Sequence, residues 1–197
     1  RPRPPVAPPV AAPVLAPMPA ARNFGEEKAR RRLELAADPR NTVGSAEVGY
    51  YLDVLLGRLK QALGPETGIA RRGPHIVVVL PASAGFPVGS TQLAPGLRAK
   101  LAPLAQALVE FRRVLVSVYV HADASVIGAS NPRLSEQRAQ VIAAYLGGAG
   151  LNPRRVLLAP PGPGKPSVTP DGTGGRTRIE IDLEPILRPG ARARARG

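Results

Sequence analysis

The chain has 197 residues, 44% of them apolar, which is enough for one domain of common size with additional segments. It contains no cysteine, which excludes disulfides, thiolate metal sites and a cysteine nucleophile. The formal net charge is +13, but three arginines lie in residues 1–22 and four in residues 188–197, where there are no acidic residues. Much of the basic charge therefore belongs to the terminal segments.

Residues 1–24 are predicted to form a Pro/Ala-rich linker. Prolines recur every few positions, so this apolar stretch cannot form a membrane-spanning helix. Its composition favours an extended spacer. The sequence shows no transmembrane segment and no secretory signal. We therefore expect any membrane anchor to lie upstream of Arg1.

Residues 25–66 are predicted to form a helical segment that packs on the following domain. The first helix covers residues 25–38, with strong helix formers and glutamates in its first turn. Its three consecutive arginines, residues 30–32, favour a solvated face paired with neighbouring glutamates over a nucleic-acid surface. The second helix covers residues 47–63 and carries an apolar stripe at helical spacing: Val48, Tyr51, Leu52, Leu55, Leu59 and Leu63.

Residues 67–187 are predicted to form one α+β domain. The pattern indicates, in order, a β-hairpin, a helix, a buried strand, a second helix, a short strand and a last alternating strand: residues 68–80, 96–111, 114–120, 132–146, 154–158 and 176–183. This βαβαβ-β order predicts a mixed sheet with two crossover helices on one face. Residues 188–197 are predicted to be a basic disordered tail.

The most specific motif lies at the corner between the buried strand and the second helix. His121 and Asp123 follow the strand, and Asn131 stands where it can cap a helix whose first residue is proline. Arg138 follows about two turns into that helix. These residues and their spacing, together with Leu134, Ser135 and Ala139, resemble the signature of the OmpA C-terminal-like family, which includes the peptidoglycan-associated lipoprotein and MotB.

The resemblance implies an OmpA-like fold and non-covalent peptidoglycan binding without enzyme activity, cofactor or metal. Asp123 would bind the ammonium of meso-diaminopimelate in a stem peptide, and Arg138 would bind its carboxylate. Asn131 would orient the ligand, and Arg178 on the last strand would border the site. The resemblance also implies a periplasmic protein that tethers the outer membrane, or an envelope complex, to the cell wall. Residues 49–53 are similar to a segment that precedes this domain in outer-membrane lipoproteins.

Several positions depart from the family pattern. Val120 and Val126 replace glycines, Ala122 replaces a threonine and Ser130 replaces an aromatic residue. A proline, Pro87, stands where an acid is usual. The alternative function is therefore a degenerate domain that serves as a protein-interaction or structural module. Asp123 and Arg138 would then form a structural salt bridge, and Asn131 would only cap the helix.

Two other classes of function are disfavoured. His121, Asp123 and Ser135 could be arranged as a catalytic triad, but the family resemblance explains all three without catalysis. His75 and His121 are the only histidines, so no histidine metal cluster is expected. The chain has three Phe and no Trp, so it has few residues on which bases could stack, and specific nucleic-acid binding is not predicted.

Overall fold

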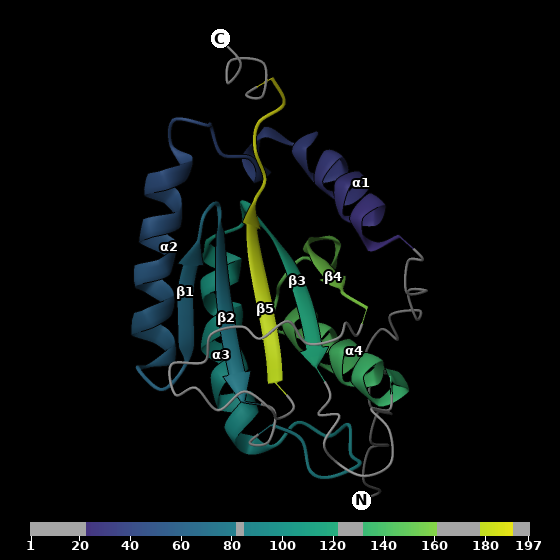
Figure 1. The fold of residues 1–197 in the computed structure, drawn as a ribbon. Helices are drawn as coiled ribbons and strands as arrows, with labels where there is room; N and C mark the ends of the chain where they lie inside the picture. Colours follow the sequence, from purple (N-terminus) through teal and green to yellow (C-terminus); the bar gives the residue numbers. More distant parts are fainter. Residues whose placement is uncertain (1–22, 82–84, 122–131, 161–177, 191–197) are drawn as a thin grey trace, which may run out of the picture.

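The computed structural model describes residues 23–81, 85–121, 132–160 and 178–190. These ranges contain a five-stranded sheet in the order β1-β2-β5-β3-β4 and helices on both of its faces (Figure 1). The elements are α1 (Phe24–Ala36), α2 (Val48–Leu63), β1 (Gly68–Arg72), β2 (His75–Pro81), α3 (Pro95–Glu110), β3 (Val114–His121), α4 (Pro132–Gly148), β4 (Val156–Leu158) and β5 (Arg178–Pro185). None of the helices in the described ranges combines the length and apolar character that a bilayer span requires.

The sheet is mixed, as the sequence predicts. Strand β5 is antiparallel to both β2 and β3, between which it lies, and β3 is parallel to β4. The hairpin of β1 and β2 turns at Gly73, which has a positive φ of 59° that glycine adopts without strain. The predicted α+β class, with β3 and β4 joined through helix α4, is confirmed.

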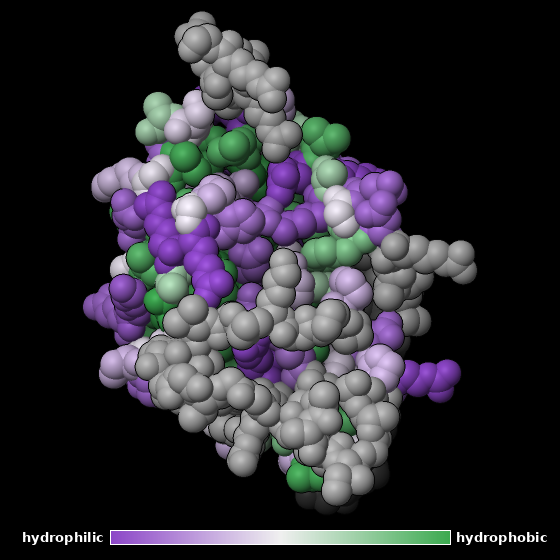
Figure 2. Space-filling view, viewed as in Figure 1, coloured by the Kyte–Doolittle hydropathy of each residue, from purple (hydrophilic) through white to green (hydrophobic). Residues whose placement is uncertain are grey.

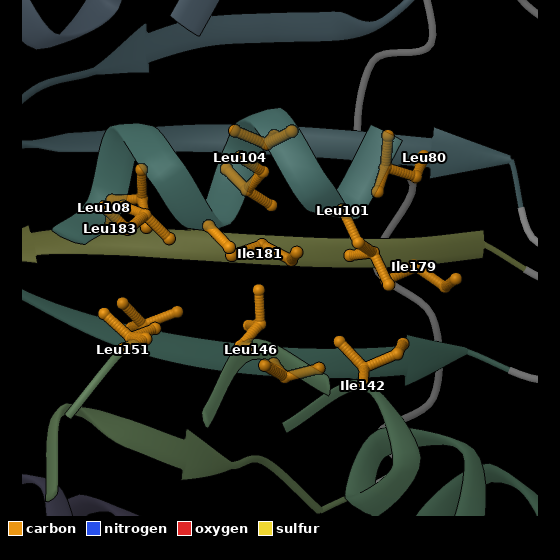
Figure 3. Close-up of a cluster of buried hydrophobic side chains, with 14 of the residues drawn as sticks. Leu80, Leu101, Leu104, Leu108, Ile142, Leu146, Leu151, Ile179, Ile181 and Leu183 are labelled. Atoms are coloured by element: carbon orange, nitrogen blue, oxygen red, sulfur yellow. The ribbon is translucent and has the colours of Figure 1, made fainter. Parts of the chain in front are cut away.

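Helices α2, α3 and α4 cover the inner face of the sheet. Side chains alternate between the two faces of a strand, so every second residue of β2, β3 and β5 meets these helices. The buried residues that these three strands give to the core are Ile76, Val78, Leu80, Val114, Val116, Val118, Val120, Ile179, Ile181 and Leu183. Figure 3 shows leucines of α3 over β5, with Ile142 and Leu146 of α4 beside them. The apolar stripe predicted for α2 is buried in the same core through Leu52, Leu55, Leu59 and Leu63.

Helix α1 packs against the other face of the sheet, which we call the outer face. Leu35 and Ala36 form a small apolar cluster there with Leu115, Leu157 and Ile186. Leu115 alternates with the inward-facing Val114 and Val116, which places this cluster opposite the main core. Helices α1 and α2, which precede the predicted domain, therefore pack on opposite faces of the sheet.

The expectation that the three arginines of α1 form a solvated face is correct only for Arg30, which pairs with Glu27 and Glu34. Arg31 is buried and donates to the carbonyl of Arg154 at 3.0 Å. Arg32 forms an ion pair with Glu184 of β5. Arg31 pairs with Glu27 at 3.0 Å as expected, but it is not solvated because α1 packs against the segment of Arg154. Arg32 departs from the expectation because α1 also lies over an acidic strand that is distant in sequence.

The last part of the domain starts slightly later than predicted. Residues Pro153–Arg155 form a 3-10 helix. Asn152 caps its start, because its side chain accepts from the backbone amide of Arg154 at 3.0 Å. Strand β4 therefore begins at Val156 rather than at Arg154. The predicted division of the chain into linker, helical segment, domain and tail stays a prediction, and most of the linker and tail lies outside the described residues.

Two ends of the sheet matter for function. At one end β3 finishes with His121, which pairs with Arg178, the first residue of β5. We call this the site end, because the predicted ligand residues follow β3 here in the sequence. At the other end β3 begins with Val114, which pairs with Pro185, the last residue of β5.

Candidate functional site

Two of the four predicted ligand residues, Arg138 and Arg178, lie among the described residues, and Arg138 has the more detailed set of contacts. It lies in α4 and is only 8% exposed. Its Nε donates to the carbonyl of Ser90 at 3.0 Å, and its Nη2 donates to the carbonyl of Pro87 at 3.3 Å. Its guanidinium carbon lies 4.9 Å from the ring centroid of Phe86, a cation–π distance. The loop before α3 therefore fixes the plane of the guanidinium.

The loop that holds Arg138 is itself a defined turn. The amide of Ser90 donates to the carbonyl of Pro87 at 3.0 Å, and Gly89 between them has a φ of 67°. A positive φ at this position is the requirement of a type II turn, which glycine satisfies without strain. The carbonyl of Pro87 thus accepts both from the turn amide and from Arg138, while Phe86 is buried beneath it.

The charge of Arg138 has no carboxylate partner among the described residues. Burial lowers the pKa of Arg138 below its ordinary value, because desolvation penalises the charged form. Within the same residues its Nη1 makes no hydrogen bond, while the other two nitrogens are held by carbonyl oxygens. A buried cation is stabilised by an anion that approaches it, and the edge at Nη1 has no anionic partner within the described ranges.

Asp123 and Asn131, the two other residues predicted at the corner, lie outside the described residues. In the sequence, Asp123 stands two positions after His121, the last residue of β3. Asn131 stands immediately before Pro132, the first residue of α4. Their roles as ammonium ligand and as ligand-orienting residue therefore stay predictions.

Arg178, the fourth predicted residue, lies at the site end but on the outer face. It shares that face with Glu180 and alternates with the inward-facing Ile179. Its Nε is 3.9 Å from a carboxylate oxygen of Glu180. Arg138 enters from α4 on the inner face, so the two arginines approach the site end from opposite sides of the sheet. The described contacts do not bring them together.

The residues of the imagined catalytic triad are also separated. Ser135 is buried in α4, which packs on the inner face. His121 belongs to the outer face, where its ring stacks on Tyr119 with a centroid distance of 6.1 Å and an interplanar angle of 4°. Its Nε2 is 3.8 Å from a carboxylate oxygen of Glu180. His121 and Ser135 therefore do not share a site.

The outer face carries a cluster of charged side chains that the sequence analysis did not identify. His75 Nδ1 lies 3.1 Å from Asp182 and 3.3 Å from Glu184, in a geometry that could hold a metal ion. Lys28 and Arg32 from α1 already form ion pairs with Glu184, and Lys28 lies 3.7 Å from Asp182. These cations balance the two carboxylates, so the ion pairs of the cluster join α1 to the sheet.

Burial and the carboxylates of β5 also affect the pKa of Tyr119. They raise its pKa to about 12, chiefly through burial, with Asp182, Glu184 and Glu180 adding repulsion. Phe24 of α1 meets the same ring edge-on at 5.9 Å. Tyr119 therefore stays neutral at physiological pH and packs as part of the contact between α1 and the sheet.

Residues 85–179 match the OmpA family. This range begins at the loop that holds Arg138 and ends within the first two residues of β5. Residues 85–179 therefore form an OmpA family domain, and the family resemblance inferred from the sequence is confirmed.

Individual relatives agree with this assignment. The Escherichia coli (strain K12) protein named "Probable lipoprotein YiaD" is 31% identical over 143 residues, which cover 71% of this chain and 65% of that protein. The chain thus spans slightly less than two thirds of the length of this curated relative.

Solved structures share the fold. The "putative MotB like protein from Desulfovibrio vulgaris" superposes with a TM-score of 0.59 at 21% identity and covers 78% of this chain and 98% of its own. The periplasmic domain of Helicobacter pylori MotB gives a TM-score of 0.52 at 18% identity and covers 62% of this chain and 81% of its own. At these identities the likeness concerns the fold alone.

Proposed function

We propose that this protein binds peptidoglycan non-covalently through the diaminopimelate of the stem peptide. The observation that carries the proposal is the state of Arg138. Its guanidinium is buried, stacked on Phe86 and oriented by two backbone carbonyls, and among the described residues no carboxylate neutralises it. A ligand carboxylate at this edge would supply the missing negative charge.

The second half of the proposed recognition is the ligand ammonium. The side-chain centre of meso-diaminopimelate carries both an ammonium and a carboxylate, so it needs an acid and an arginine at a fixed separation. Asp123 follows β3 at the site end, and Arg138 enters the same end from α4. In the proposed complex Asp123 binds the ammonium, Asn131 orients the ligand and Arg178 adds positive charge from the outer face.

The proposed biological role is to tether an outer membrane or an envelope complex to the cell wall from the periplasm. Three findings support this role: the OmpA family domain, the similarity to an E. coli protein named as a lipoprotein, and the shared fold with a periplasmic domain of MotB. The role needs no catalytic group.

The experiment that tests the proposal is a sedimentation assay with purified sacculi. The full chain should sediment with sacculi whose stem peptides contain meso-diaminopimelate, and free muropeptide of the same type should compete. Sacculi with lysine at the same stem position are the matched control, because lysine has the ammonium but lacks the carboxylate that Arg138 would bind. Equal binding to both kinds of sacculi would contradict the assignment of Arg138.

One observation favours a second candidate function, a structural or protein-interaction module. Two of the three guanidinium nitrogens of Arg138 are already used within the fold, to hold the turn at Pro87 and Ser90. In that case Arg138 would stabilise the domain but would not contact a ligand. The same sedimentation assay separates the two functions, because a degenerate module would bind neither kind of sacculus.

A further inference from the structure

The end of the sheet opposite the site end collects arginines from several parts of the chain. Three segments meet there as neighbours: the amide of Ile186 donates to the carbonyl of Arg113 at 2.9 Å, and the amide of Arg188 donates to the carbonyl of Val43 at 3.1 Å. The 3-10 helix before β4 adjoins them, since Arg31 donates to the carbonyl of Arg154. We call this region the basic end.

The basic end carries an excess of exposed positive charge. Arg112, Arg154 and Arg188 are exposed, and among the described residues none of them forms an ion pair. Arg40 is also exposed but pairs with Asp38 at 2.8 Å. The pKa of Asp38 is lowered, chiefly by its hydrogen bond to Arg40, and the charge of Arg112 contributes to the shift. The exposed arginines of the basic end thus outnumber Asp38, the acidic residue that lies among them, and leave an excess of positive charge.

An apolar groove opens beside these arginines. It has a volume of ≈ 490 Å³ and lies between the last turns of α1, the β1–β2 turn and the segment after β5. Its lining includes Leu33, Ala36, Pro74, Leu187, Pro189 and, at its rim, Arg188. Leu33 is 71% exposed, an unusual position for a large apolar side chain. In the view of Figure 2, hydrophobic residues gather at the upper end of the molecule, where Figure 1 places the end of β5.

We propose that the basic end docks on the surface of an anionic phospholipid bilayer. Exposed arginines are attracted to the negative headgroups, and an exposed apolar side chain among them enters the boundary between headgroups and acyl chains. Arg112 and Arg188 supply the first kind of contact and Leu33 the second.

The combination of features favours a lipid surface over a nucleic acid. Leu33 and the groove are apolar, and an apolar surface gains nothing from phosphates alone. The groove lining contains no Phe, Tyr or Trp on which bases could stack, and its imidazole, His75, is in contact with Asp182 and Glu184. Because the site end and the basic end are opposite ends of one sheet, a membrane bound at the basic end leaves the site end directed away from it.

The experiment measures binding of the full chain to phosphatidylcholine vesicles with and without phosphatidylglycerol. The chain should bind only the anionic vesicles, and the affinity should fall as salt rises. The double variant Arg112→Gln, Arg188→Gln should lose affinity on the order of tenfold or more, since each arginine near an anionic surface contributes a factor of about five. The matched control is Lys60→Gln, Arg98→Gln, which removes the same charge from two exposed residues outside the basic end.

A second pair of variants tests the apolar contact. Leu33→Gln should weaken vesicle binding severalfold, whereas Val54→Gln, which changes a 41% exposed residue on α2, should leave it unchanged. Loss of affinity in the basic-end variant but not in its control supports the proposal. An absence of vesicle binding, or equal losses in the two double variants, would overturn it.

Duplex DNA serves as the competing polyanion. If DNA binds with the same dependence on Arg112 and Arg188, and Leu33→Gln has no effect on vesicles, the surface recognises charge alone and the lipid assignment is wrong. The vesicles contain no peptidoglycan, so these outcomes are independent of whether the site end binds the cell wall.

Discussion

Arg138 and Phe86 form a stacked pair in which the guanidinium carbon lies 4.9 Å from the ring centroid. The two residues come from different elements, α4 and the loop before α3, and the pair is completed by hydrogen bonds to Pro87 and Ser90. This arrangement fixes the orientation of a buried cation before any ligand arrives. Preorganisation of this kind reduces the entropy lost on binding.

We predict that replacement of Arg138 weakens peptidoglycan binding in a graded way. Arg138→Met removes the charge and should cost about 2–5 kcal/mol of binding free energy at a desolvated site. Arg138→Lys should recover only part of this, because a lysine ammonium cannot form the planar fork of a guanidinium. Isothermal titration with a soluble muropeptide measures both effects.

The control for this series separates binding from stability. Loss of the guanidinium also removes the donor that Arg138 gives to the carbonyl of Ser90 and leaves the carbonyl of Pro87 with only the turn amide of Ser90, at a cost of about 1–3 kcal/mol of folding free energy. Phe86→Leu removes the stacking but keeps the charge, so it should lower the melting temperature while it affects binding less than Arg138→Met does. If all three variants melt earlier but bind like the unaltered chain, Arg138 has only a structural role.

We predict that Asp123 and Arg138 are energetically coupled through the ligand. Each single replacement by alanine should remove one half of the zwitterion recognition, and the double replacement should bind only slightly less well than either single one. A double-mutant cycle on the binding free energy measures the coupling, which is typically about 0.5–3 kcal/mol for residues that act together. Additive losses would show that the two residues do not hold the same ligand group.

We predict that Arg155 is essential for stability and irrelevant for binding. All three of its guanidinium nitrogens donate to carbonyls near the end of α3, namely those of Leu108, Phe111 and Val114, at 2.7–2.9 Å. Burial lowers its pKa to about 10, so it stays charged at neutral pH and complements the carbonyl end of the helix. Arg155→Met should therefore cost about 3–5 kcal/mol of folding free energy.

Thermal unfolding monitored by circular dichroism checks this prediction. A loss of that size lowers the melting temperature of a chain this long by roughly 10 °C. The neighbouring exposed residue gives the matched control, because Arg154→Met should change stability by less than about 0.5 kcal/mol. An equal loss in both variants would mean that the three carbonyl contacts are not responsible.

The parts of the fold that follow local patterns could be predicted from the sequence. The hairpin, β3 and the apolar faces of α2 and α3 depend on residue spacing within each element, and all of them are found where the spacing indicates. The family motif at the strand–helix corner likewise placed Arg138 in a helix, because its spacing is local, whereas its role as a ligand residue stays a prediction.

Contacts between distant segments could not be predicted in this way. The ion pair between Arg32 and Glu184 joins residues 152 positions apart, and nothing in the spacing of either segment shows it. Arg155 gives no local signal either, since its partners are backbone carbonyls of another element. Nothing in the local sequence around Phe86 and Ser90 indicates that they hold Arg138, which only the fold shows.

We predict that the two N-terminal helices differ in their importance for folding. A chain that starts at residue 41 lacks α1 and loses the contacts of Leu35 and Ala36 with the outer face, so it should fold with reduced stability. A chain that starts at residue 67 also lacks α2, whose four buried leucines belong to the main core, at about 2 kcal/mol or more each. Calorimetry should show a cooperative transition for the first chain and none for the second.

The last prediction concerns the pH dependence of the cluster that holds α1 on the sheet. The pKa of Asp182 is raised above its ordinary value of 3.8, chiefly by burial, although His75 and Lys28 oppose the shift. A raised pKa in the folded state means that the stabilising contribution of Asp182 is complete below 3.8 and is lost as the pH rises through the folded pKa. At neutral pH the ionised carboxylate therefore lowers stability. Asp182→Asn should then be at least as stable as the unaltered chain at neutral pH, because Glu184 still pairs with Lys28 and His75.

The same variant should lose this advantage as the pH falls below about 4, where the carboxyl group of the unaltered chain is protonated in both states. Glu184→Gln is the matched control on the same strand. It removes the partner of Lys28 and Arg32 and should cost about 1–3 kcal/mol of folding free energy at neutral pH. Melting temperatures measured across the acidic range distinguish the two residues. If Asp182→Asn is destabilised at neutral pH as strongly as Glu184→Gln, Asp182 acts as a necessary ion-pair partner of α1, and the argument from its raised pKa is wrong.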